Sequence, residues 1–151
     1  MNRQRHKESS LSRGLAFLSE RDREIMTGEM EEIFCRGGST LFTMDEPAEG
    51  MYVLVEGRIA VQKPTGFGDR IQVVALLDPG APVGEGGLLQ GWMRSSTLVA
   101  VTDSRLLFLS TEAFEKLETD YPQLALKLVK WGISRLSMRL KKNSERLARI
   151  L

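Results

Sequence analysis

The segment Val83–Thr97, VGEGGLLQGWMRSST, contains the residues whose types and spacing are best suited to chemistry. It holds one acid, Glu85, and one base, Arg94, nine positions apart, and its other residues carry no charge. A desolvated guanidinium or carboxylate is costly unless it has a partner. The two charges therefore either pair with each other or nearby backbone, or they serve a ligand.

The residues around the two charges favour an anionic ligand that also carries hydroxyl groups. Small residues after Gly84 allow backbone N–H groups to converge, and a short helix over 86–91 would direct its N-terminus at an anion. Arg94 has a bidentate fork that suits two phosphate oxygens. Glu85 offers acceptors for paired hydroxyls, as on a ribose. We expect neither residue to belong to the core.

The sequence argues against an enzyme. His6 is the sole histidine and Cys35 the sole cysteine, so no Ser-His-Asp or Cys-His arrangement and no His/Cys metal cluster can be assembled. No GxxxxGK[ST] motif is present. We therefore expect no catalytic residues, no metal ligands and no cofactor.

Composition predicts one cytoplasmic domain. A chain of 151 residues with 42% hydrophobic content can bury one core, no apolar run reaches membrane-spanning length, and the N-terminus has no secretory signal. Charge is uneven: residues 14–120 carry a net −9, and residues 121–151 a net +7. The basic segment either contacts an acidic partner or is a solvated face.

Apolar periodicity predicts short strands between two helical regions. Ser19 is placed to cap a first helix, and Ser110 or Thr111 a later one. The intervening runs are short, evenly spaced and bounded by turn residues, which favours an antiparallel sandwich or barrel. The predicted strands cover residues 40–43, 51–55, 58–62, 71–77, 98–101 and 106–109.

A helix from about Gln123 to the end carries an a/d seam, which predicts a homodimer. Its members step alternately by three and four residues, and Asn143 is the polar one. The seam either folds back on the chain's own β body or packs against a second copy. A second apolar stripe on a neighbouring face is available for the β body, which favours the second copy. The seam residues are Leu126, Val129, Ile133, Leu136, Leu140, Asn143, Leu147 and Ile150.

The pattern G-E-x-x-L-L-x-G-x-x-R-S-x-T resembles the phosphate-binding cassette of the cyclic-nucleotide-binding domain family, which includes bacterial catabolite activators, cyclic-nucleotide-regulated kinases and gated channels. The likeness covers residues 15–150. It implies a mainly β fold: an antiparallel, jelly-roll-like β-roll flanked by an N-terminal helix, a short cassette helix and C-terminal helices. It also implies a flexible tail over 1–14, the roll over 15–120, and a closing, dimerising helix over 121–151.

The resemblance also implies roles for individual residues. Arg94 would grip the cyclic phosphate, with Ser95 and backbone amides near Gly86 and Gly87, and Glu85 would bind the ribose 2′-hydroxyl. Cyclic AMP is favoured over cyclic GMP, although Ser95 does not decide the base. The candidate ligand-binding residues are Gly84, Glu85, Gly86, Gly87, Leu88, Arg94, Ser95 and Ser96.

Several positions depart from the family pattern. In the cassette, Gly86 stands where the family usually has a bulkier apolar residue, Met93 where many members have proline, and Val83 where an aromatic residue is common. In the closing helix, Arg139-Leu140 stand where catabolite activators direct hydroxyl side chains at the base. No helix-turn-helix follows, so no DNA binding is expected, and the downstream partner is unknown. Two functions stay open: a cyclic-nucleotide sensor whose closing helix responds to ligand, and a nucleotide-free dimerisation or docking module.

Overall fold

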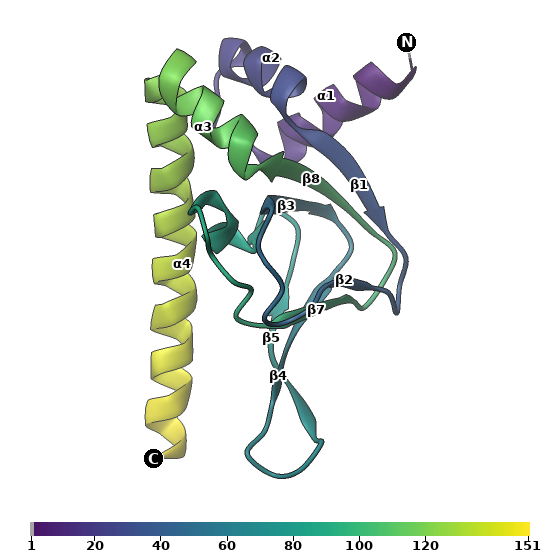
Figure 1. Ribbon diagram of the computed structural model, residues 1–151, viewed down its shortest axis with the longest axis vertical. Helices are drawn as coiled ribbons and strands as arrows, with labels where there is room; N and C mark the ends of the chain where they lie inside the picture. The colour runs from purple at the N-terminus through teal and green to yellow at the C-terminus, as the bar shows by residue number, and fades with distance from the viewer. Residues whose placement is uncertain (1) are drawn as a thin grey trace. The chain divides into compact units, whose positions relative to one another are not determined.

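The computed structural model describes residues 2–151, which form two compact units (Figure 1). One unit ends at Phe114, and the other covers Glu115–Leu151. In chain order the elements are α1 (Asn2–Gly14), α2 (Glu20–Glu29), β1 (Glu31–Cys35), β2 (Thr40–Phe42), β3 (Gly50–Glu56), β4 (Ile59–Pro64), β5 (Ile71–Leu77), β6 (Pro82–Val83), η1 (Glu85–Leu88), β7 (Thr97–Ala100), β8 (Ser104–Ser110), α3 (Thr111–Asp120) and α4 (Pro122–Ile150).

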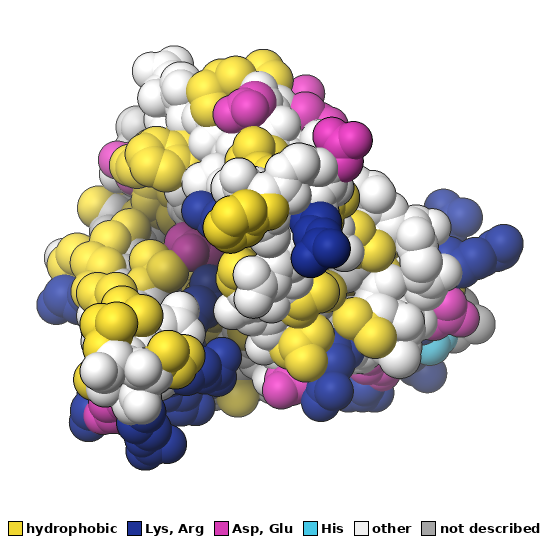
Figure 2. Space-filling model, turned by 90° about the horizontal axis from the view of Figure 1, so that it is seen from below, with side chains coloured by type: hydrophobic (Ala, Val, Ile, Leu, Met, Phe, Trp, Pro, Cys, Tyr) yellow, Lys and Arg dark blue, Asp and Glu magenta, His cyan; other side chains and the backbone are white. Residues whose placement is uncertain are grey.

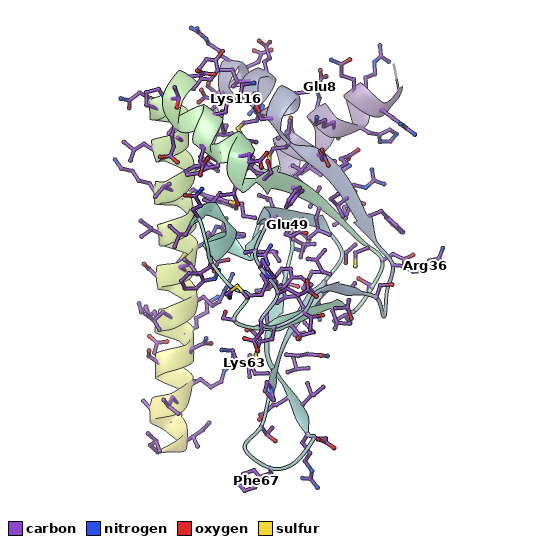
Figure 3. The ribbon with its side chains drawn as sticks, in the orientation of Figure 1. Glu8, Arg36, Glu49, Lys63, Phe67 and Lys116 are labelled. Carbon is purple, nitrogen blue, oxygen red and sulfur yellow. The ribbon has the colours of Figure 1, made fainter. Side chains whose placement is uncertain are left out.

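The strands form two four-stranded antiparallel sheets, with orders β1-β8-β3-β6 and β2-β7-β4-β5. Strands that are distant in sequence are neighbours in both sheets: Tyr52 of β3 faces Phe108 of β8, and Val61 of β4 faces Leu98 of β7. The predicted antiparallel roll is confirmed. Its β4–β5 hairpin projects from the roll and carries the exposed Phe67 at its tip (Figures 1 and 3).

The core lies between the two sheets and is built from one face of each. Fully burying a Leu, Ile, Val or Phe side chain contributes about 1.5–3 kcal/mol, so a core of this size carries most of the stability of the roll. The central cluster consists of Cys35, Phe42, Leu54, Ile59, Leu77, Val83, Leu98, Ala100 and Leu106.

Local sequence signals located most elements correctly. Asp22 N–H donates to Ser19 Oγ at 3.1 Å, and Ala113 N–H donates to Ser110 Oγ at 3.0 Å, so both predicted caps are confirmed. The strand predicted over 71–77 has those bounds. Strands β1 and β6 were missed, because Glu31-Glu32 resembles a solvated helix end and β6 is only two residues long.

The expected flexible tail is a helix instead. Residues 2–14 form α1, in which Leu11 is fully buried, and Leu15, just after the helix, is buried as well. Ser10 Oγ donates to Glu32 Oε1 at 2.6 Å, and Arg13 pairs with a carboxylate of the sheet. The helix is mostly polar, so its own periodicity is weak. Contacts with distant residues order it.

Helix α4 leaves most of the predicted seam exposed. Leu140 is 68% exposed and Leu147 57%, and Figure 2 shows hydrophobic and basic side chains next to one another at the C-terminal end of this helix. By contrast, Leu124 and Leu128 near the start of α4 are buried. Among the helices of residues 2–151, none is both long and apolar enough to cross a membrane.

Candidate ligand-binding site

The cassette connects β6 to β7, and its helix is shorter than predicted. The expected helix over 86–91 is a four-residue 3-10 turn, η1, and Leu89 N–H closes it by donating to the Gly86 carbonyl at 2.9 Å. Gly84 before the turn and Gly91 after it have positive φ angles of 63° and 76°. These left-handed residues break the helix on both sides. A macrodipole argument does not apply to so short a turn.

Turn η1 is packed directly on the backbone of β3. A Cβ atom on Gly87 would lie 1.8 Å from the Gly50 carbonyl oxygen, so no other residue fits without moving the turn. Thr111, the first residue of α3, donates its hydroxyl to the Gly87 carbonyl at 2.6 Å. Sequence reasoning identified Gly87 but missed Gly50 and Thr111, which are distant in the chain.

Arg94 is buried, with only 4% of its surface exposed, which corrects the expectation that it lies outside the core. Its Nη1 donates to the Gly84 carbonyl at 2.9 Å, and its Nη2 donates to the Gly50 carbonyl at 2.7 Å. A Cβ atom on Gly84 would lie 2.4 Å from Nη1, so this position also requires glycine. The guanidinium has more N–H donors than these two bonds use.

Two aromatic rings line the other side of the Arg94 guanidinium. Its carbon lies 3.9 Å from the centroid of Phe42 and 5.9 Å from that of Tyr52, and the two rings stack on each other at 6.2 Å. A desolvated cation–π contact contributes about 2 kcal/mol. The rings come from β2 and β3, so both sheets position this one side chain. No local signal around Arg94 indicates them.

The surroundings of Arg94 change its pKa in two opposite directions. Burial lowers the pKa of the guanidinium, because desolvation disfavours the charged form. Tyr52 and the carboxylates of Glu46, Glu85 and Glu49 act in the other direction and favour the cation. Since the pKa of a guanidinium starts far above neutral, Arg94 is a cation at neutral pH. The site thus presents a fixed positive charge.

The other predicted residues surround this centre with different exposure. Glu85 begins η1 and is half-buried, as is Leu88 at its end. Ser95 is exposed beside Arg94, whereas Ser96 is 7% exposed. The structure therefore brings Gly84 and Arg94 into direct contact and fixes Gly87 against β3. Gly86 contacts Trp92, which sequence reasoning did not single out.

The chain belongs to the cyclic nucleotide-binding domain family, whose model matches residues 32–121. A cyclic nucleotide-gated potassium channel of Mesorhizobium japonicum is 33% identical over 88 residues, which are 58% of this chain and 22% of the channel. A CRP-like cAMP-activated global transcriptional regulator of Mycobacterium tuberculosis is 21% identical, covering 83% of this chain and 54% of that protein. The chain thus spans about half or less of these relatives.

Solved structures show the same fold. A cyclic nucleotide-binding domain from Methylobacillus flagellatus superposes with a TM-score of 0.82 at 22% identity, over 89% of this chain and 75% of that one. The Thermus thermophilus catabolite activator protein gives a TM-score of 0.71 at 25% identity, over 93% and 62% of the two chains.

The burial of Arg94 predicts a structural cost when it is removed. Arg94→Ala removes the hydrogen bonds to the Gly84 and Gly50 carbonyls and the contact with the Phe42 ring, so we expect the free energy of unfolding to fall by about 1–3 kcal/mol. Arg58→Ala is the matched control, because its ion pair with Asp78 is exposed and contributes about 0–1 kcal/mol. Urea denaturation measures both. Equal losses would contradict the structural role of Arg94.

Proposed function

We propose that the unit ending at Phe114 binds a cyclic nucleotide and performs no catalysis. The observation that carries the proposal is the buried cation of Arg94, which keeps donors beyond its two carbonyl bonds inside a cassette with the family spacing. A related solved structure of the same fold, with a TM-score of 0.62, is described as cAMP-bound PfPKA-R.

The proposed roles follow the chemistry of each group. Arg94 donates to the cyclic phosphate, together with the Ser95 hydroxyl and backbone amides of the turn at Gly86 and Gly87. Glu85 accepts from the ribose 2′-hydroxyl. Three further residues shape the cassette: Gly84 through its carbonyl contact with Arg94, and Leu88 and Ser96 through their partly or largely buried side chains.

Calorimetry with cyclic AMP tests these roles. Truncating one member of a buried charge pair costs about 2–5 kcal/mol, so Arg94→Ala should weaken binding by roughly thirty-fold to several thousand-fold. Glu85→Ala removes contacts to a neutral hydroxyl and should cost about 1–3 kcal/mol. Arg58→Ala should bind like the wild type.

If Arg94→Ala binds cyclic AMP with the affinity of the wild type, the ligand lies outside the cassette. Because Arg94→Ala also lowers stability, each variant is first shown to be folded by circular dichroism. Cyclic AMP is the proposed ligand over cyclic GMP. A tenfold preference for cyclic GMP in competition, about 1.4 kcal/mol, would reverse that choice.

The alternative is a nucleotide-free docking module of the same fold. The observation that favours it is the bonding of Arg94 to two backbone carbonyls, which gives the cation partners within the protein. A thermal shift separates the two functions, because a ligand that binds only the folded state raises stability by RT ln(1 + [L]/Kd). An unchanged melting temperature with millimolar cyclic AMP and cyclic GMP would favour the docking module.

We also propose that helix α4 responds to ligand binding. A hydrogen bond made by Thr111 supports this proposal. The Thr111 hydroxyl donates to the Gly87 carbonyl in the cassette turn. Thr111 is also the first residue of α3, which leads into α4. A shift of the turn on binding would therefore pull on the start of α3. This hydrogen bond connects the cassette turn to the first residue of α3.

Thr111→Val should weaken this coupling, because it keeps the shape of the side chain and removes the hydroxyl. Hydrogen exchange of α4 is measured with and without cyclic AMP. We expect a ligand-dependent change in the wild type and a smaller one in Thr111→Val. Thr119→Val is the matched control, since its hydroxyl bonds within α3, to the Glu115 carbonyl. An equal change in all three proteins would contradict the coupling.

The exposed seam of α4 supports a parallel homodimer. Its apolar members alternate by three and four residues and lie largely in solvent, as Ile133 at 57% and Leu140 at 68% show. Knobs-into-holes packing with a second copy would cover them, and Asn143 would set the register at a cost in stability.

Leu140→Glu should convert the dimer to a monomer. Sedimentation at micromolar concentration should give about twice the chain mass of 16.9 kDa for the wild type, and the single chain mass for the variant. Met138→Glu is the matched control: Met138 is also exposed, at 52%, but it lies off the seam, so this variant should stay dimeric. A monomeric wild type would contradict the proposal, as would a dimeric Leu140→Glu combined with Leu136→Glu.

A further inference from the structure

The indole of Trp92 occupies the space where a side chain at position 86 would lie. A Cβ atom on Gly86 would be 2.3 Å from Trp92 Nε1 and 2.6 Å from its Cδ1. The backbone of Trp92 is fixed on both sides: its N–H donates to the Leu89 carbonyl at 3.3 Å, and its carbonyl accepts from Ala48 N–H at 2.8 Å. The glycine and the tryptophan are therefore complementary in shape.

Turn η1 is consequently held between two different surfaces. On one side Gly87 meets the Gly50 carbonyl, which is strand backbone and cannot yield. Against Gly86 lies the Trp92 side chain, which is 44% exposed and can be removed without opening the core. The indole is therefore the support of the turn that a substitution can remove.

We propose that Trp92 is a positioning residue that holds the start of η1 where Glu85 meets the ribose hydroxyl, and this rests on the function proposed above. Glu85 and Gly86 share a peptide bond, so a displacement of Gly86 displaces the Glu85 carboxylate. Arg94 bonds the Gly84 carbonyl next to the turn, but it is also held outside η1, by the Gly50 carbonyl and the Phe42 ring. Because the proposed phosphate contacts also include Arg94 and the Ser95 hydroxyl, which lie outside η1, loss of Trp92 should weaken the ribose contact more than the phosphate contact.

The test compares cyclic AMP with 2′-deoxy cyclic AMP, which lacks the hydroxyl. The wild type should prefer cyclic AMP. Trp92→Ala should weaken cyclic AMP binding by about five- to twenty-fold, within the range for residues in contact, and should reduce the preference for the hydroxyl. Gly86→Ala should have the same effect, because its Cβ displaces the indole, and the double variant should be no worse than either single one.

Two further variants separate positioning from general packing. Trp92→Phe keeps an aromatic ring over Gly86 and should retain most of the hydroxyl preference. Met93→Ala is the matched control, since Met93 is adjacent and similarly exposed, at 48%, and it should match the wild type. If Trp92→Ala fails to fold, Gly86→Ala and Trp92→Phe carry the comparison.

The outcomes separate the two proposals. If the wild type binds neither nucleotide, the proposed function and this inference both fall. If the wild type binds cyclic AMP but the hydroxyl preference of Trp92→Ala and Gly86→Ala equals that of the wild type, the proposed function stands and the role of Trp92 is overturned. Additive losses in the double variant would overturn it as well, because independent sites add.

Discussion

Burial of one cation, the Arg94 guanidinium, constrains the rest of the roll. Taking a charge out of water is costly unless the protein returns equivalent interactions. Here the Gly84 and Gly50 carbonyls accept hydrogen bonds, and the faces of Phe42 and Tyr52 receive the cation. Both sheets contribute, so the side chain is positioned by the β body as well as by the loop that contains it.

The same constraint explains the glycines around the cassette. At position 84 a side chain would meet the guanidinium, and at position 87 it would meet the Gly50 carbonyl. The start of β3 thus serves two purposes, because Gly50 accepts from Arg94 and supports the turn that carries Glu85. The phosphate-facing and ribose-facing parts of the proposed site share this strand but have separate side-chain supports. A substitution can therefore affect one part more than the other.

A regulatory role requires that the ligand bind one arrangement of the chain more tightly than another. The Thr111–Gly87 hydrogen bond offers a physical basis for such a difference, since it joins the cassette turn to the first residue of α3. Charge is also unevenly distributed along the chain: the roll is acidic, and the segment after residue 120 is basic.

The sequence alone determined the features that depend on local patterns. The helix caps at Ser19 and Ser110, the strand over 71–77 and the spacing of Glu85 and Arg94 can all be read from short segments, because capping, strand alternation and turn chemistry act between near neighbours. The family resemblance rests on the same kind of local pattern.

Only the tertiary structure decided which distant residues complete the site. Phe42, Gly50 and Thr111 reach the cassette because β2, β3 and the start of α3 meet there, and strand order and register are not encoded in the periodicity of any one strand. The order of α1 likewise depends on the tertiary packing that buries Leu11 and not on its own weak pattern. The sequence also did not indicate that Gly86 packs against Trp92. A glycine leaves space for a side chain, and only three-dimensional packing determines which residue fills that space.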